Sequence, residues 1–136
     1  MCLESVDTVA LVVSKAFKCV REGEDNLTSP GDPFYHSPVY DHARFRVGAT
    51  TVADYQQKGE TIRAESGEWY PVGIHCWPNI EDAIADRVPH PHEVILECDV
   101  EDIVASGLQR VSSVTPLSRP CVVARRVTPI RVMPAG

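Results

Sequence analysis

The stretch VGIHCWPNIEDAIADR, residues 72–87, decides the fold because it joins a strand to the clearest helix of the chain. Residues 74–77 alternate in the way that is typical of a strand. Asn79 is a favoured N-cap residue of a helix. Acidic side chains follow it in the first turn, where the helix dipole stabilises negative charge. We therefore predict a strand that runs into a short amphipathic helix over about residues 79–87.

The rest of the chain favours strands. The pattern of residues 94–100 is the clearest, since Val94, Leu96, Cys98 and Val100 alternate with Ile95, Glu97 and Asp99, and Glu93 precedes them on the second face. Residues 102–107 suggest a short turn or helix, and Pro129 predicts a break in the last strand. Further strands are expected at residues 14–20, 43–47, 50–53, 61–64, 110–114 and 121–132.

One helix among strands, without a repeat or a linker, predicts one α+β domain over residues 1–136. The expected architecture is a mainly antiparallel sheet with the helix packed on one face. As residues 94–100 form so strong a strand, a second copy could pair with it to make a homodimer.

Residues 43–47 carry the first candidate for binding. Strict alternation would turn Ala43, Phe45 and Val47 to the core and Arg44 and Arg46 outward. Two guanidinium groups on one strand face can hold a phosphate or a carboxylate. A solvated strand face is the alternative.

His75 is the second candidate, and its role depends on which face of its strand is wet. If Ile74 and Cys76 face the core, His75 faces a cleft or an edge. In the opposite register it is a hydrogen-bonded core histidine beside Trp77. Neighbouring strand side chains diverge, so Cys76 and His75 do not form a nucleophilic pair.

Aromatic residues could supply a floor for a planar ligand, although they are equally suited to filling a core. Tyr35 and His36 lie in a proline-rich segment, and Trp77 ends the strand described above. The predicted ligand-binding residues are therefore His75, Trp77, Arg44, Arg46, Tyr35 and His36.

Composition argues against several classes of function. Thirteen basic against nineteen acidic residues give a net charge of −6, which disfavours nucleic acid as a partner. No apolar run is long enough to span a bilayer, and the N-terminus lacks the basic region of a signal peptide. Five isolated cysteines indicate a reducing compartment, so a cytosolic protein is expected.

We expect no metal and no cofactor. A metal site needs three or four converging ligands. His90 and His92 are two apart in a prolyl segment, so their side chains point away from each other. No catalytic residue is assigned.

The residues Gly73 to Trp77, followed by Asn79 to Ala83, resemble an uncharacterised domain of phage and bacterial proteins, some of which also carry pentapeptide repeats. Residues 14–20, 45–48, 94–102 and 122–127 are similar to other elements of that family. The resemblance implies a compact α+β domain associated with phages or mobile elements, and no particular chemistry.

A looser similarity connects the chain with ADP-ribosyltransferase-like folds, which also place a Gly-Ile-aromatic strand before a short helix. That resemblance would give Tyr35, His36 and Glu97 catalytic roles on a nicotinamide nucleotide, but the Ser-x-Ser of those enzymes is missing. We expect instead a protein that binds a host component or a small anionic ligand without turnover. A structural or assembly accessory protein is the other alternative.

Overall fold

The computed structural model describes residues 3–22, 35–36, 44–53, 61–87, 93–112 and 115–133, and every structural statement concerns these ranges. All strand pairings in them are antiparallel, and one short helix follows the seventh strand, as the predicted α+β class requires. The elements are β1 Lys15–Glu22, β2 Tyr35–His36, β3 Arg44–Phe45, β4 Thr51–Val52, β5 Thr61–Arg63, β6 Trp69–Pro71, β7 Ile74–Cys76, α1 Ile80–Arg87, β8 Glu93–Ser112 and β9 Thr115–Val132.

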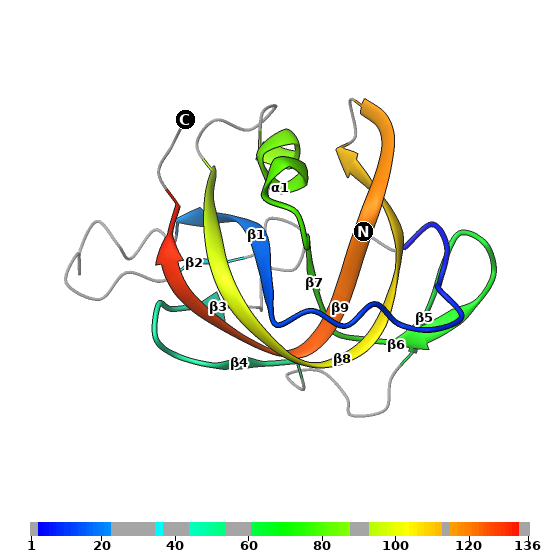
Figure 1. Ribbon diagram of the computed structural model, residues 1–136, viewed down its shortest axis with the longest axis horizontal. Helices are drawn as coiled ribbons and strands as arrows, with labels where there is room; N and C mark the ends of the chain where they lie inside the picture. The colour runs from blue at the N-terminus through cyan, green and yellow to red at the C-terminus, as the bar shows by residue number, and fades with distance from the viewer. Residues whose placement is uncertain are drawn as a thin grey trace.

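Two long strands, β8 and β9, form the centre of the molecule and curve strongly along their length (Figure 1). Asp102 has a φ of 55°, next to a register shift between Ile103 and Ala105. A short polar residue tolerates this left-handed conformation, and a bulge bends a strand. The turn or helix predicted at residues 102–107 is therefore wrong, because pairing with β9 continues through the bulge.

The predicted break at Pro129 is also wrong. Pro129 lies opposite Cys98, beside a register irregularity between Glu97 and Cys98. An irregularity is where a strand accommodates a residue that has no N–H to donate. β9 therefore runs on to Val132.

The sheet has the strand order β3-β2-β1-β8-β9-β4, and β7 pairs with β9 beside this path. Residues Phe17 and Trp77 exchange two backbone hydrogen bonds of 2.7 Å, which connect β7 to β1 as well. Because β8 lies between β1 and β9, residues 94–100 do not form a sheet edge. Pairing of two copies through this strand, as the sequence suggested, has no open edge to use.

Strand alternation divides the apolar side chains into two cores. The inner core, enclosed by the curved sheet, consists of Ala16, Val20, Tyr35, Phe45, Ala53, Ile74, Cys76, Leu96, Cys98, Val100, Val122, Ala124 and Val127. The outer core lies under the N-terminal segment, the β5–β6 hairpin and α1, and consists of Leu3, Ala64, Tyr70, Trp77, Ala83, Ile95, Ala105, Val111, Cys121 and Val123. β7 contributes to both.

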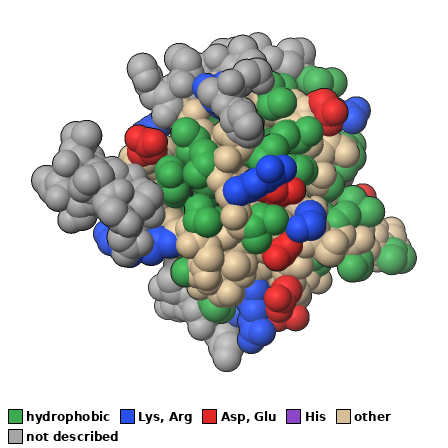
Figure 2. Space-filling view, turned by 60° about the vertical axis from the view of Figure 1, so that its left-hand side comes forward, with side chains coloured by type: hydrophobic (Ala, Val, Ile, Leu, Met, Phe, Trp, Pro, Cys, Tyr) green, Lys and Arg blue, Asp and Glu red, His purple; other side chains and the backbone are tan. Residues whose placement is uncertain are grey.

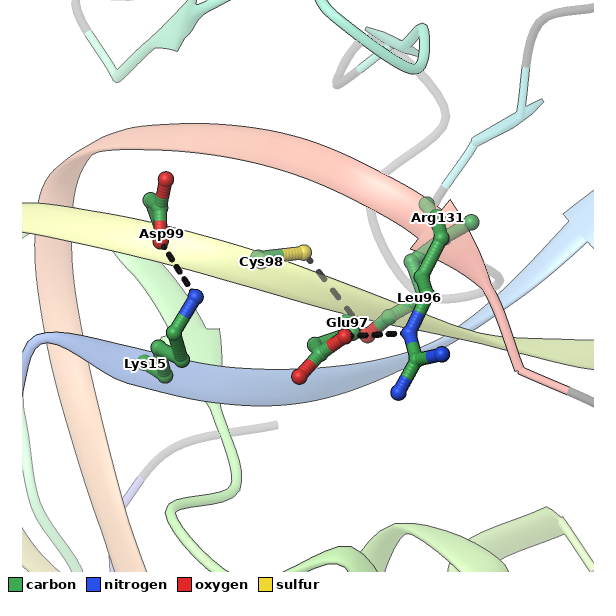
Figure 3. Close-up of polar contacts among 6 residues, drawn as sticks. All are labelled: Lys15, Leu96, Glu97, Cys98, Asp99 and Arg131. Atoms are coloured by element: carbon green, nitrogen blue, oxygen red, sulfur yellow. Dashed lines mark hydrogen bonds and ion pairs between the residues drawn. The ribbon is translucent and has the colours of Figure 1, made fainter.

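The alternation predicted for residues 94–100 is confirmed. Leu96 and Cys98 are buried in the inner core, whereas Glu97 and Asp99 project from the opposite face of β8. There they accept hydrogen bonds from Arg131 Nε at 2.5 Å and Lys15 Nζ at 3.2 Å (Figure 3).

In β3, Phe45 is fully buried and Arg44 is exposed, as predicted. The prediction that Val47 faces the core is wrong, since 47% of its surface is exposed. The strand ends at Phe45, and a tight turn closed by the Ala49 N–H and the Arg46 carbonyl follows. Alternation does not continue through a turn. Ala43 lies outside the described residues.

Two glycines permit close packing that a larger residue would prevent. A Cβ at Gly73 would lie 2.7 Å from Cγ1 of Val123, so this residue lets the chain approach β9 just before β7. A Cβ at Gly107 would lie 1.8 Å from the carbonyl oxygen of Ser5. The N-terminal segment therefore rests directly on β8, where Glu4 and Asp7 donate backbone hydrogen bonds of 2.8 Å to Leu108 and Ser106.

The helix α1 begins as the sequence predicts, because the carbonyl of Asn79 accepts the Asp82 N–H at 3.1 Å. Ala83 is fully buried in the outer core, which places α1 against the β1 and β8 side of the molecule. Asp82 is buried too, and one of its oxygens accepts a hydrogen bond from Arg119 Nε at 3.1 Å. Within the described ranges, no helix is long and apolar enough to cross a membrane.

Candidate functional site

His75 lies at the centre of β7 with its imidazole directed to the outer side of the sheet. Its neighbours Ile74 and Cys76 are buried in the inner core, which is the first of the two registers considered for this strand. The face of His75 is covered by the outer core, which includes Trp77. The imidazole is partly buried, and its centroid lies 6.0 Å from that of the Tyr70 ring. His75 is thus a hydrogen-bonded histidine at the margin of the outer core.

One ring nitrogen of His75 has a defined partner. Nδ1 lies 2.6 Å from Oε1 of Gln109. Because an amide oxygen only accepts, Nδ1 carries the proton and Nε2 carries the lone pair. Burial lowers the pKa of His75 to about 4, despite the opposing effect of the Gln109 hydrogen bond. The imidazole is therefore neutral at physiological pH, with Nε2 as an acceptor.

The backbone of His75 is held from the inner side. Lys18 Nζ donates a 2.8 Å hydrogen bond to the His75 carbonyl oxygen, and it lies 5.7 Å from the centroid of the Phe45 ring. The same positive charge helps to lower the pKa of His75. Gln109 and Lys18 thus fix His75 from the two faces of the sheet.

Trp77 is buried in the outer core, and its indole N–H donates to Oδ2 of Asp86 at 3.3 Å. This bond satisfies a buried donor and connects the end of β7 to α1. Trp77 therefore has a structural place beside His75. A planar ligand cannot stack on a ring that is 4% exposed.

The other predicted residues lie elsewhere. Tyr35 is buried in the inner core and pairs with Phe45, whereas Trp77 belongs to the outer core. The predicted aromatic floor that would combine Tyr35 and Trp77 is therefore wrong. It is Trp69, on the β5–β6 hairpin, that is most exposed among the described aromatic residues, at 65%.

Arg44 and Arg46 are both exposed, and strand register brings a third arginine near them. The backbone of His36 pairs with Arg21 on one side and with Arg44 on the other. Residues opposite each other in neighbouring strands project to the same face. Arg21 and Arg44 thus share the outer face of the sheet, about 10 Å apart across β2.

A buried carboxylate lies beside this face. Glu93 accepts hydrogen bonds from the thiol of Cys19 at 2.9 Å and from Arg21 at 3.4 Å, and its carbonyl accepts Arg87 Nε at 2.7 Å. Arg21 and Arg87 therefore converge from β1 and α1. We call Arg21, Arg44, Arg46 and Arg87 the arginine face.

On the face of the molecule shown in Figure 2, Lys or Arg side chains lie next to Asp or Glu side chains, with hydrophobic side chains between them. The described ranges contain exposed ion pairs such as Lys15 with Asp99 and Arg126 with Asp102. Exposed pairs of this kind contribute little to stability. Within each such pair, the two opposite charges offset each other.

The cysteines of the described ranges are all free and buried. Burial raises the pKa of each thiol, that of Cys76 to about 11. The thiolate is the reactive form of cysteine. These four residues, Cys19, Cys76, Cys98 and Cys121, are thus poor nucleophiles.

No group of three His, Cys, Asp or Glu side chains that could hold a metal ion occurs in the part of the chain that the structure describes. His42, His90 and His92 lie outside it. The residues of the looser resemblance are also separated. Tyr35 is in the inner core, whereas Glu97 projects from the other face of β8 and pairs with Arg131.

Sequence reasoning missed Lys18 and Gln109. The signal for Lys18 was present, because Ala16 and Val20 flank it at spacings of two and mark the buried face of β1. Gln109 had no such signal. It reaches His75 only because β8 continues past the bulge at Asp102.

Comparison with known proteins adds no relative to this description. A scan against protein-family models, a search of curated proteins and a search of solved structures each found no match to the chain.

Proposed function

We propose that the protein is an accessory protein of phage or mobile-element type that acts in the host cytosol. It binds a small anionic, nucleotide-like ligand and does not turn it over. The resemblance of residues 73–83 to phage and bacterial domains supports the proposed phage or mobile-element type. The arginine face is the observation that carries the proposed binding of an anion.

Three features suit the arginine face to an anion. Arg21 and Arg44 project from one side of the sheet, and Arg46 is exposed at the turn that follows β3. Arg87 enters from the end of α1. Guanidinium groups bind phosphate and carboxylate bidentately and remain charged at every physiological pH. A ligand with two or more phosphates could contact several of them together.

The protein as a whole carries a net charge of −6, so the arginine face is a local exception. A small anion can bind such a face, whereas an extended polyanion would meet the acidic remainder of the surface. The proposed ligand is therefore a small molecule. A host protein with an acidic segment would meet the same face and is the alternative partner.

Binding without turnover is supported by the state of the candidate catalytic groups. His75 has a pKa of about 4, and Gln109 holds the Nδ1 side of its ring. The described thiols are protonated because burial raises their pKa. Tyr35 and Glu97, which an ADP-ribosyltransferase-like enzyme would use together, belong to opposite faces of the sheet.

Isothermal titration with ATP, a cyclic dinucleotide and NAD⁺ tests the proposal. We expect at least one to bind, and we expect the double variant Arg44→Met, Arg46→Met to bind it at least tenfold more weakly. Arg126→Met is the matched control, because Arg126 is an exposed arginine that pairs with Asp102 and is not one of the four residues of the arginine face.

The same mixtures are then analysed for products by NMR. Product formation that requires the protein would contradict binding without turnover and would favour the enzyme alternative. Failure of all three ligands to bind would contradict the small-molecule proposal. Capture from host lysate that depends on Arg44 and Arg46 would then favour an acidic protein partner.

A further inference from the structure

Residues 9–13, with the sequence VALVV, form an apolar run on the surface just before β1. We call them the apolar segment. Val9 is 83% exposed, Val12 is 79% exposed and Leu11 is 41% exposed. Single exposed apolar side chains are normal on a protein surface, whereas a consecutive run of them is typical of an interaction surface. The apolar segment therefore requires a partner.

The position of the apolar segment beside β8 explains its exposure. Before it, the Asp7 N–H donates to the Ser106 carbonyl at 2.8 Å, and after it the Ser14 carbonyl accepts the Val100 N–H at 3.0 Å. Between these two contacts, β8 bends at its bulge. The segment, part of the blue chain that leads into β1 in Figure 1, therefore follows β8 without forming a regular ladder with it.

The backbone of the apolar segment can also accept a partner. In the described structure, its only hydrogen bond runs from the Leu11 N–H to Oγ of Ser106, at 2.7 Å. Successive peptide groups of an extended chain point to opposite sides, so those of Ala10 and Val12 point away from β8. All five residues of the segment have a negative φ, as an added strand requires.

The charges that flank the apolar segment indicate which partner fits it. No residue from 8 to 14 is charged, whereas Asp7 precedes this range and Lys15 follows it, and both are exposed. If two copies of the segment lie antiparallel about Leu11, Asp7 of each copy comes to the end where the other copy has Lys15. Opposite charges on neighbouring strands stabilise their pairing, and like charges oppose it. The segment is thus complementary to itself in the antiparallel direction.

We propose that the apolar segment binds the same segment of a second copy of this chain, with a two-fold axis at Leu11. Ala10 of each copy then lies opposite Val12 of the other, and the backbone groups of these two residues form the connecting hydrogen bonds. The symmetry closes the contact, so the product is a dimer and not a fibre. Because the contact is small, the dimer is weak and forms at high protein concentration.

Sedimentation equilibrium between about 10 µM and about 1 mM protein, a range suited to a small contact, tests the proposal. We expect the wild-type protein to pass from monomer to dimer. Val12→Glu should weaken association at least tenfold, because it places a carboxylate in the apolar contact. Ala10→Lys combined with Val12→Glu should recover association, since each new ammonium group then faces a new carboxylate of the other copy. Val47→Glu, at an exposed valine beside β3, is the matched control and should not change association.

Hydrogen exchange provides a second readout on the wild-type protein, independent of whether the variants fold. The amides of Ala10 and Val12 should exchange more slowly as the concentration rises, while that of Ile62 in β5 should not change. Four results would overturn the inference. They are a monomer throughout the range, undiminished association of Val12→Glu, no recovery in the double variant, and exchange at Ala10 and Val12 that does not depend on concentration.

Discussion

The two sides of β7 differ in how they are held. On the inner side, Ile74 and Cys76 pack among apolar side chains. On the outer side, His75 and Trp77 also contact apolar residues, but each has a directional hydrogen bond, to Gln109 and to Asp86. A single strand therefore joins a core that depends on close packing to one that depends on packing and polar partners together.

This difference has energetic consequences. Close-packed apolar side chains contribute in proportion to the surface and volume they fill, with little effect of pH. Buried hydrogen-bonded groups add specificity, but each becomes costly when its partner or its protonation state changes. The inner core should thus determine most of the stability, and the outer core should determine how stability varies with pH.

The largest effect is expected in the inner core. Phe45→Ala removes a fully buried ring and should lower the free energy of unfolding by about 3–5 kcal/mol. Urea denaturation measures the change. Val47→Ala, two residues later and 47% exposed, is the control and should change stability by less than about 0.5 kcal/mol. Equal effects of the two would contradict the burial of Phe45.

The next effect is the pH dependence caused by His75. Its folded pKa of about 4 lies below the unfolded value of 6.5, so the unfolded chain binds the proton first as the pH falls. The contribution of neutral His75 to the free energy of unfolding is complete above pH 6.5. It is lost progressively as the pH falls towards 4, with a total of about 3 kcal/mol.

Denaturation of the wild-type protein and of His75→Asn at pH 7, 6, 5 and 4 measures this term. The asparagine variant should lose the part of the slope between pH 6.5 and pH 4 that His75 causes. If the two slopes are the same, His75 does not change its pKa on folding.

A smaller effect is expected at Tyr70, whose buried hydroxyl accepts the Leu3 N–H at 2.9 Å. Tyr70→Phe keeps the ring and leaves that donor without its partner, which should cost about 1–2 kcal/mol. Hydrogen exchange of the Leu3 amide should become faster, while amides of β1 should not change. Unchanged exchange at Leu3 would show that this bond does not hold the N-terminal segment.

The sequence was most informative where local patterns decide structure. Alternation in residues 74–77 and the cap at Asn79 predicted the passage from β7 to α1, because both depend on neighbours within a few residues. Alternation in residues 94–100 was equally reliable. Alternation in residues 43–47 gave a wrong prediction at Val47. The alternating pattern continues in the sequence there, but the turn at Arg46 has already ended the strand.

Long-range pairing explains the remaining differences. Asp102 and Gly107 have the composition of a turn, but β9 provides hydrogen-bonding partners that keep β8 extended through the bulge. In the site, alternation showed that His75 and Cys76 face opposite ways, but it could not show that a second core covers the His75 side. That core is built from the N-terminal segment, the β5–β6 hairpin and α1, which are distant in sequence.

The central claim is that His75 is a neutral, hydrogen-bonded residue of the outer core and not a titrating catalytic group. Titration of ¹⁵N-labelled protein by NMR tests it most directly, because the imidazole nitrogen shifts report both pKa and tautomer. We predict a pKa near 4 with the proton on Nδ1. A pKa at or above 6.5, or a proton on Nε2, would contradict this account.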